Sequence, residues 1–179
     1  MDNCVSSPLK YADKTANFVD YVIRKTQQDT GFSARLRRAD NPATEYQSWE
    51  ILAEFGIDLE KPWQRLPYCL IGAALAKAKP SADGALTLGH AIAACYEDGN
   101  RSAQAKARLR RVLACTDTPE LCRILRPLLT LIHSRGIALN YSMLLKDLTY
   151  FSSQGRERIC AQWAQQFYRR TTPLEGEQA

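Results

Sequence analysis

The sequence predicts an all-α protein, and three observations lead to that fold class. Apolar side chains recur every three or four positions along nearly the whole chain, which is helical spacing. The alternation of β-branched residues that strands require is missing. A chain of 179 residues that is 45% hydrophobic and 24% charged can bury a sizeable core. We therefore expect a compact helical bundle.

Four helices are expected in the first half of the chain, each marked by apolar side chains on one face. The first ends near residues 29–31 and the second near 41–42, where turn-forming residues stand. The third contains Trp49. The fourth opens at Pro62 or at Pro67, because a proline in the first helical turn loses no hydrogen bond.

Residues 80–84, Pro-Ser-Ala-Asp-Gly, form the clearest internal break, since turn formers here separate two apolar helical runs. The predicted organisation is an N-terminal helical part over 1–80 and a C-terminal helical bundle over 81–170. Polar and acidic residues 171–179 are expected to be a frayed tail. Whether the two parts form one bundle or two small sub-bundles stays open.

The second half is also expected to be helical throughout. Helices are predicted over 86–96 and 101–115, and the next begins at Thr118, whose hydroxyl serves as its cap. Pro127 should kink that helix, because its ring clashes with an earlier carbonyl. Asn140 is expected to cap the following helix. The last helix carries an apolar stripe of Ile159, Trp163 and Phe167.

Positive charge is concentrated in residues 101–135, which hold eight basic side chains and two acidic ones. This stretch carries a net +6, whereas the whole chain carries +5. Seven of the eight basic residues are arginines, whose planar guanidinium groups bind phosphate in a bidentate manner. The pattern indicates a surface for a polyanion, bound with salt-dependent affinity and without reading base sequence.

Helical geometry predicts how these charges are arranged. Arg108 and Arg111 lie to one side of helix 101–115, and Lys106 and Arg110 lie to the other. On the next helix Arg123 and Arg126 repeat the spacing of three. Two antiparallel helices would place these rows side by side as one stripe. The sequence lacks acidic partners one turn away, which favours nucleic-acid contact over simple solvation. Aromatic residues are not interleaved with the arginines, so we expect contact with the backbone rather than base stacking.

Other sequence features indicate no enzyme, cofactor or metal site. No phosphate-binding loop, dinucleotide motif or nucleophile elbow is present, and His90 and His133 stand outside metal-ligand motifs. Carboxylates crowd residues 45–60 with no basic residue between them: Glu45, Glu50, Glu54, Asp58 and Glu60. They allow a metal-carboxylate site, but a solvated face, or one that docks on a basic partner, is favoured.

Cellular location is indicated by two negative observations. No apolar run approaches the ~20 residues that a membrane span needs, and the first residues show no secretory signal. We expect a cytoplasmic protein with no membrane association. The cysteines contain no C-x-x-C pair and fall in apolar helical patterns, so they should be reduced core residues. They are Cys4, Cys69, Cys95, Cys115, Cys122 and Cys160.

Several short segments also follow one another in a family-specific order over about Asn17 to Tyr168. The motifs are Gly31-Phe32-Ser33-Ala34-Arg35-Leu36-Arg37-Arg38-Ala39, Leu88-Gly89-His90-Ala91-Ile92-Ala93, Arg110-Arg111-Val112-Leu113, Leu125-Arg126-Pro127-Leu128-Leu129 and Leu144-Leu145-Lys146-Asp147-Leu148-Thr149-Tyr150-Phe151, then Arg156, Arg158 and the Trp163 to Tyr168 ending. In their order and spacing they resemble the CasB family, the small subunit of the type I-E CRISPR surveillance complex Cascade. The family usually carries arginine where His90 stands.

The resemblance implies an all-helical, non-catalytic protein that sits in Cascade beside a second copy of itself, between the repeated backbone subunits and the large subunit. There it would hold the hybrid of guide RNA (crRNA) and target DNA together with the displaced strand, the structure called an R-loop. The phosphate contacts implied by the matched motifs are Arg35, Arg37, Arg38, Arg110, Arg111, Arg126, Arg156 and Arg158. Helix geometry adds Arg108 and Arg123. The alternative function is a helical adaptor that binds an acidic protein through the same arginine stripe.

Overall fold

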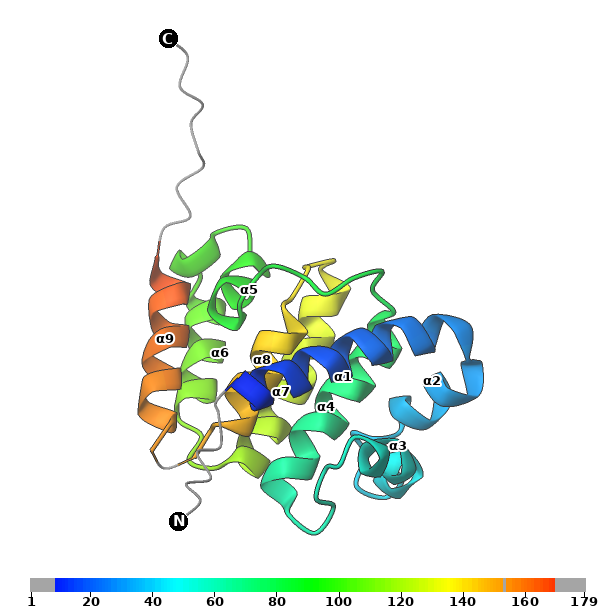
Figure 1. Cartoon of the computed structure of the whole chain (residues 1–179). Helices are drawn as coiled ribbons and strands as arrows, with labels where there is room; N and C mark the ends of the chain where they lie inside the picture. The colour runs from blue at the N-terminus through cyan, green and yellow to red at the C-terminus, as the bar shows by residue number, and fades with distance from the viewer. Residues whose placement is uncertain (1–8, 153, 170–179) are drawn as a thin grey trace.

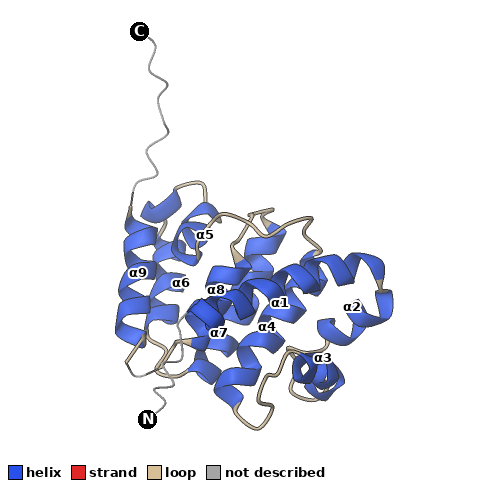
Figure 2. Cartoon of the chain, viewed as in Figure 1, coloured by secondary structure: helices blue, strands red, loops and turns tan. Residues whose placement is uncertain are grey.

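The structure is a computed structural model that describes residues 9–152 and 154–169 (Figure 1). Over these ranges it is all helical apart from loops, which confirms the predicted fold class (Figure 2). The helices are α1 Leu9–Gln28, α2 Thr30–Arg37, the 3-10 helix η1 Glu45–Ser48, α3 Trp49–Glu54, α4 Pro62–Ala78, α5 Leu88–Ala94, the 3-10 helix η2 Gly99–Arg101, α6 Ala103–Leu113, α7 Thr118–Ser134, α8 Tyr141–Thr149 and α9 Arg156–Tyr168. The tail predicted at 171–179 lies outside the described residues.

Local capping signals set most helix boundaries. The first helix ends at Gln28 as predicted, and the next begins at once because the Asp29 side chain accepts a 2.9 Å hydrogen bond from the backbone N–H of Phe32. The fourth helix opens at Pro62, which decides between the two prolines considered. Pro67 lies buried inside α4. Asn140 caps α8 as predicted, accepting from the N–H of Met143 at 2.8 Å.

The start of α7 differs from the prediction by one residue. Asp117, and not Thr118, is the cap, and its carboxylate accepts from the N–H of Glu120 at 2.8 Å. Thr118 is the first residue of the helix, and its buried hydroxyl donates to the carbonyl of Phe151 at 2.9 Å. The hydroxyl therefore ties α7 to the segment before α9. The helix runs uninterrupted across Pro127 to Ser134.

The predicted break at 80–84 is a loop that is bound tightly to the start of α8. The carboxylate of Asp83 accepts from the backbone N–H groups of Tyr141 and Ser142 at 2.7 and 3.1 Å. Gly84 lies so close to the chain before α8 that a Cβ there would stand 2.2 Å from the carbonyl oxygen of Ala138. The loop is thus held in place by residues far away in sequence.

Helices from both sides of this loop share one hydrophobic core. Helix α4 packs on α7 and α8, and α1 also packs on α8, while α9 packs on α5 and α6. Figure 1 shows α5, α6 and α9 at one end of the molecule and α2 and α3 at the other, with α7 and α8 between them. The stripe of Ile159, Trp163 and Phe167 on α9 is fully buried, as predicted. None of the described helices combines the length and apolar character needed to cross a membrane.

Candidate nucleic-acid interface

The two basic helices lie next to each other and share a small cavity lined by arginines. Helices α6 and α7 are joined by the short loop 114–117 and pack together. Arg108 and Arg111 from α6 and Arg123 from α7 line a cavity of about 130 Å³ between them. The predicted apposition of the two arginine rows is therefore present at these three positions.

These three guanidinium groups are not neutralised. Arg111 and Arg123 are exposed and Arg108 is half-buried. The Nε of Arg108 donates to the Tyr96 hydroxyl at 2.6 Å, which orients the side chain without removing its charge. Among the described residues, no carboxylate lies within 4.0 Å of any of the three guanidinium groups. The cavity wall is therefore a cluster of cations open to an external anion.

The positive surface continues from α7 towards α4. Arg123 also lines a neighbouring cavity of about 200 Å³ with Arg126, and Arg126 lines a third, of about 80 Å³, with Lys77 and His133. Successive cavities share a side chain, so they form one series of hollows over three helices. We call the series the arginine seam; its basic residues are Arg108, Arg111, Arg123 and Arg126, with Lys77 at its end.

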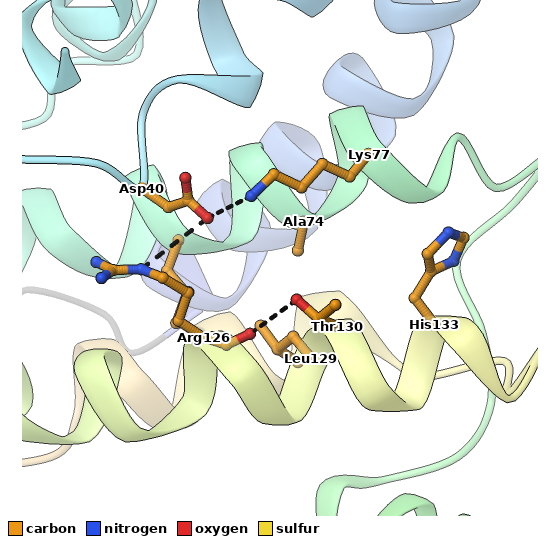
Figure 3. A pocket seen from close by; sticks show the side chains of 8 residues that line it. Asp40, Ala74, Lys77, Arg126, Leu129, Thr130 and His133 are labelled. Atoms are coloured by element: carbon orange, nitrogen blue, oxygen red, sulfur yellow. Dashed lines mark hydrogen bonds and ion pairs between the residues drawn. The ribbon is translucent and has the colours of Figure 1, made fainter.

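Two acidic residues, Asp40 and Glu45, also line these cavities, and Asp40 contacts basic side chains of the seam. The carboxylate of Asp40, in the turn after α2, lies 2.5 Å from Lys77 Nζ and 4.0 Å from Arg126 Nε. Figure 3 shows Asp40 between the two cations, which come from α4 and α7. Positive charge at this end of the seam is thus partly compensated inside the protein.

The second row on α6 faces another way. Lys106 lines a broad open groove with Phe167, Tyr168 and Arg169 of the α9 end. Arg110 is one turn further along the same side of α6 and is exposed. The structure therefore brings together Arg108, Arg111, Arg123 and Arg126, but it places Arg110 on the α9 side of the helix rather than on the seam.

The three arginines at the end of α2 do not line the cavities of the seam, and each has a partner within the protein. Arg35 forms a 2.9 Å ion pair with Glu50, and Arg38 donates to the Gln47 side chain at 2.8 Å. The Nε of Arg37 donates to the carbonyl of Ala76 at 3.2 Å, beside Lys77. Arg37 therefore lies close to the end of the arginine seam.

The two arginines of α9 differ from each other. Arg156 donates from Nε to the carbonyl of Cys115 at 2.6 Å and from a terminal nitrogen to the carbonyl of Leu113 at 3.0 Å. It thereby binds the last carbonyl of α6 and a carbonyl of the loop that follows, where a cation is favoured by the helix dipole. Arg158 is exposed, and its charge acts on Asp147 of α8.

Three of the five carboxylates predicted to form a solvated or docking face at 45–60, Glu45, Glu50 and Asp58, form ion pairs within the protein. Glu45 is buried, pairs with Arg65 and accepts from the indole N–H of Trp49 at 3.1 Å. Asp58 pairs with Lys61 at 2.9 Å. Arg35 and Arg65 come from helices on either side of the stretch, so the local sequence could not show the pairing. Among the described residues, no group of three or more metal-ligating side chains is arranged to hold a metal ion.

The histidines occupy different environments. Nδ1 of His90 lies 2.8 Å from the hydroxyl of Thr87, within the first turn of α5. His133 is exposed and lines the cavity with Lys77 and Arg126 (Figure 3).

Lys77 and Asp40 are not among the site residues predicted from the sequence, because each lies outside the basic stretch 101–135. The signal that could have found Lys77 is its place in the last turn of a helix that ends beside α7.

Fold and surface together define a class: small all-α proteins that expose a seam of arginines between neighbouring helices. The chain belongs to the family described as CRISPR-associated protein Cse2, which matches residues 33–168. This confirms the predicted family, CasB of type I-E Cascade. No curated protein sequence matches the chain.

Two solved structures support the fold. The crystal structure of CasB from Thermobifida fusca is similar with a TM-score of 0.67 at 20% identity, covering 87% of this chain and 98% of that one. The crystal structure of M. ruber CasB is similar with a TM-score of 0.64 at 25% identity, covering 84% of this chain and 92% of that one. At 20% identity the likeness to the Thermobifida fusca structure establishes the fold alone.

Proposed function

We propose that this protein is a non-catalytic, nucleic-acid-binding small subunit of type I-E Cascade in the cytoplasm. In this proposal it stabilises the hybrid of crRNA and target DNA and the displaced strand, beside the backbone and large subunits and a second copy of itself. The observation that carries the proposal is the cavity between α6 and α7, lined by Arg108, Arg111 and Arg123, which have no acidic partner in the described part of the chain.

The chemistry of this surface fits backbone contact. Guanidinium groups bind phosphate oxygens strongly and carry no base-reading information unless they reach base edges in a groove. Exchange of a DNA strand into an RNA–DNA hybrid is close to balanced in free energy, so protein contacts to the backbone can decide whether the open state persists. This balance holds for a single-protein effector, and we extend it to a complex of several subunits. Pairing with the guide already supplies the sequence information.

The test removes two exposed arginines of the seam, Arg111→Ala with Arg123→Ala, and measures binding of single-stranded DNA and of an RNA–DNA hybrid at several salt concentrations. The measurement is made on the free protein and on the assembled complex. Each lost phosphate contact should lower the slope of log affinity against log salt by about one unit. An unchanged slope in both settings would contradict the proposal.

The matched control is Arg24→Ala with Lys146→Ala. Both residues are exposed, on α1 and α8, and neither lines the arginine seam. The control loses the same net charge, so any general electrostatic effect appears in both proteins. A loss of slope confined to the seam variant assigns the contacts to the seam. If the wild-type protein binds an acidic protein but does not bind nucleic acid at ~100 mM salt, the adaptor function is favoured instead.

A further inference from the structure

Asp40 is held by two cations from two different helices. Its Oδ2 lies 2.5 Å from Nζ of Lys77 on α4 and 4.0 Å from Nε of Arg126 on α7 (Figure 3). The Asp40 side chain is only 12% exposed, whereas those of Lys77 and Arg126 are 44% and 39% exposed. The carboxylate therefore lies beneath two cations whose outer parts face solvent.

The contact with Arg126 leaves that side chain incompletely satisfied. A distance of 4.0 Å is too long for a hydrogen bond, and the Nε of Arg126 is buried with no hydrogen-bond partner among residues 9–152 and 154–169. A buried donor without an acceptor is unfavourable, and it gains from any closer oxygen ligand. The Asp40 carboxylate is therefore within hydrogen-bond distance of Lys77 but not of Arg126.

The position of this cluster connects it with the arginine seam. Arg126 lines both the cavity that it shares with Lys77 and the cavity that it shares with Arg123. A backbone that followed the exposed guanidinium groups of Arg111 and Arg123 would next meet Arg126 and Lys77. Phosphate and carboxylate oxygens bind the same cations with similar geometry, and guanidinium forms bidentate pairs with both.

We propose that Lys77 and Arg126 form a phosphate-binding site at the end of the arginine seam, and that Asp40 is the internal anion that occupies it until a nucleic-acid phosphate takes its place. The proposal rests on the proposed function and adds Lys77 as a contact residue and Asp40 as a competitor. Asp40 belongs to a turn and not to a helix, so exchange of its side chain breaks no helical hydrogen bond.

The test is Asp40→Asn, which keeps the shape of the side chain and removes its charge. Binding of a single-stranded oligothymidylate and of an RNA–DNA hybrid is measured over a range of salt concentrations. We expect the affinity to rise by roughly three- to tenfold near ~100 mM salt. The slope of log affinity against log salt should steepen by about one unit, which corresponds to one additional phosphate contact. Adding Lys77→Ala to this variant should remove most of the gain.

Asp58→Asn is the control, because Asp58 pairs with Lys61 at 2.9 Å, outside the seam, and its loss changes the net charge equally. Affinity and slope that respond alike to Asp40→Asn and Asp58→Asn would overturn the proposal, as would weaker binding by Asp40→Asn. Thermal melting checks folding of each variant. If Asp40→Asn melts too low to assay, Lys77→Ala alone tests the same site: a shallower slope supports the proposal and an unchanged slope overturns it.

The two proposals fail in different ways. If Arg111→Ala with Arg123→Ala lowers the slope while Asp40→Asn behaves as Asp58→Asn, the seam binds nucleic acid and the site at Asp40 does not exist. If none of these variants changes the slope relative to the wild-type chain, in the free protein or in the assembled complex, both proposals fall.

Discussion

The guanidinium group of Arg156, in the first turn of α9, binds the loop directly after α6: its Nε donates a 2.6 Å hydrogen bond to the carbonyl oxygen of Cys115. A second bond, of 3.0 Å, reaches the carbonyl of Leu113. The last carbonyls of a helix have no partner within the helix and carry partial negative charge. The side chain of Arg156 therefore connects α9 to the backbone at the end of α6, and its guanidinium group makes its hydrogen bonds within the protein.

Replacing Arg156 by alanine should consequently destabilise the fold. Two charge-assisted hydrogen bonds are lost and the carbonyls stay half-buried, so we expect the free energy of unfolding to fall by about 2 kcal/mol. Urea denaturation followed by circular dichroism measures the change. Arg110→Ala is the matched control, because Arg110 is an exposed helical arginine whose loss should alter stability by less than ~0.5 kcal/mol. Equal stabilities of the two variants would show that Arg156 has no such role.

Gly89 should not tolerate a side chain, because α5 and α9 approach each other closely there. A Cβ at this position would stand 2.2 Å from the carbonyl oxygen of Trp163 and 2.8 Å from the backbone nitrogen of Phe167. Backbone atoms cannot rotate away, so Gly89→Ala should force the helices apart and cost about 3 kcal/mol of unfolding free energy.

The control for that change is Gly31→Ala, where the nearest atom to a new Cβ is the Asp29 carboxylate oxygen at 3.4 Å. Gly31 lies in the first turn of α2, so alanine should be neutral or stabilising by about 0.5 kcal/mol. Thermal melting of both variants provides the comparison. A Gly89→Ala protein as stable as Gly31→Ala would mean that α5 and α9 are not in such close contact.

Helix positions could be predicted from the sequence because their signals are local. Apolar spacing and caps act within a few residues, as at Asn140 and in the stripe that contains Trp163. The start of α7 was misplaced because Asp117 and Thr118 are both good cap residues, and the partner that Thr118 has instead, the Phe151 carbonyl, is distant in sequence.

The site was predicted less completely than the fold, for the same physical reason. The spacing of the arginines on α6 and α7 was enough to predict that Arg108, Arg111 and Arg123 lie together, as they do around one cavity. Sequence spacing gave no means of seeing that Arg156 binds carbonyls at the end of α6 and in the loop after it, or that Asp40 lies between cations of α4 and α7. Such contacts join segments whose relative position is set by packing of the whole core.

The deeply buried cysteines should be unreactive in the folded protein. Burial raises the pKa of Cys69 and of Cys122 to about 12, so at pH 8 only about one thiol in ten thousand is a reactive thiolate. Cys160 is only half-buried. Burial raises the pKa of its thiol, and the positive charge of Arg156 offsets part of that rise. Peptide mapping after iodoacetamide treatment should therefore find Cys160 modified before the other two. Equal rates at all three would contradict this burial.

Asp147 should make stability depend on pH in a direction opposite to that of most carboxylates. Burial raises the pKa of its carboxyl group, and the 2.8 Å hydrogen bond from the indole N–H of Trp163 opposes that rise. A carboxyl with a higher pKa in the folded than in the unfolded state binds its proton more tightly when folded. Its stabilising contribution is therefore full below the unfolded pKa of about 3.9 and is lost as pH rises through the folded value.

Asp147→Asn tests this linkage, because the amide is neutral at every pH and its oxygen can still accept from Trp163. We expect the variant to be more stable than the wild-type chain near neutral pH, and the difference to shrink as pH falls towards 4. Urea denaturation at a series of pH values measures it. Asp147→Leu separates charge from hydrogen bonding: it leaves the buried indole N–H without an acceptor and should be about 1–3 kcal/mol less stable than Asp147→Asn at every pH. A difference between Asp147→Asn and wild type that stays constant with pH would show that the carboxyl group has the same pKa in both states.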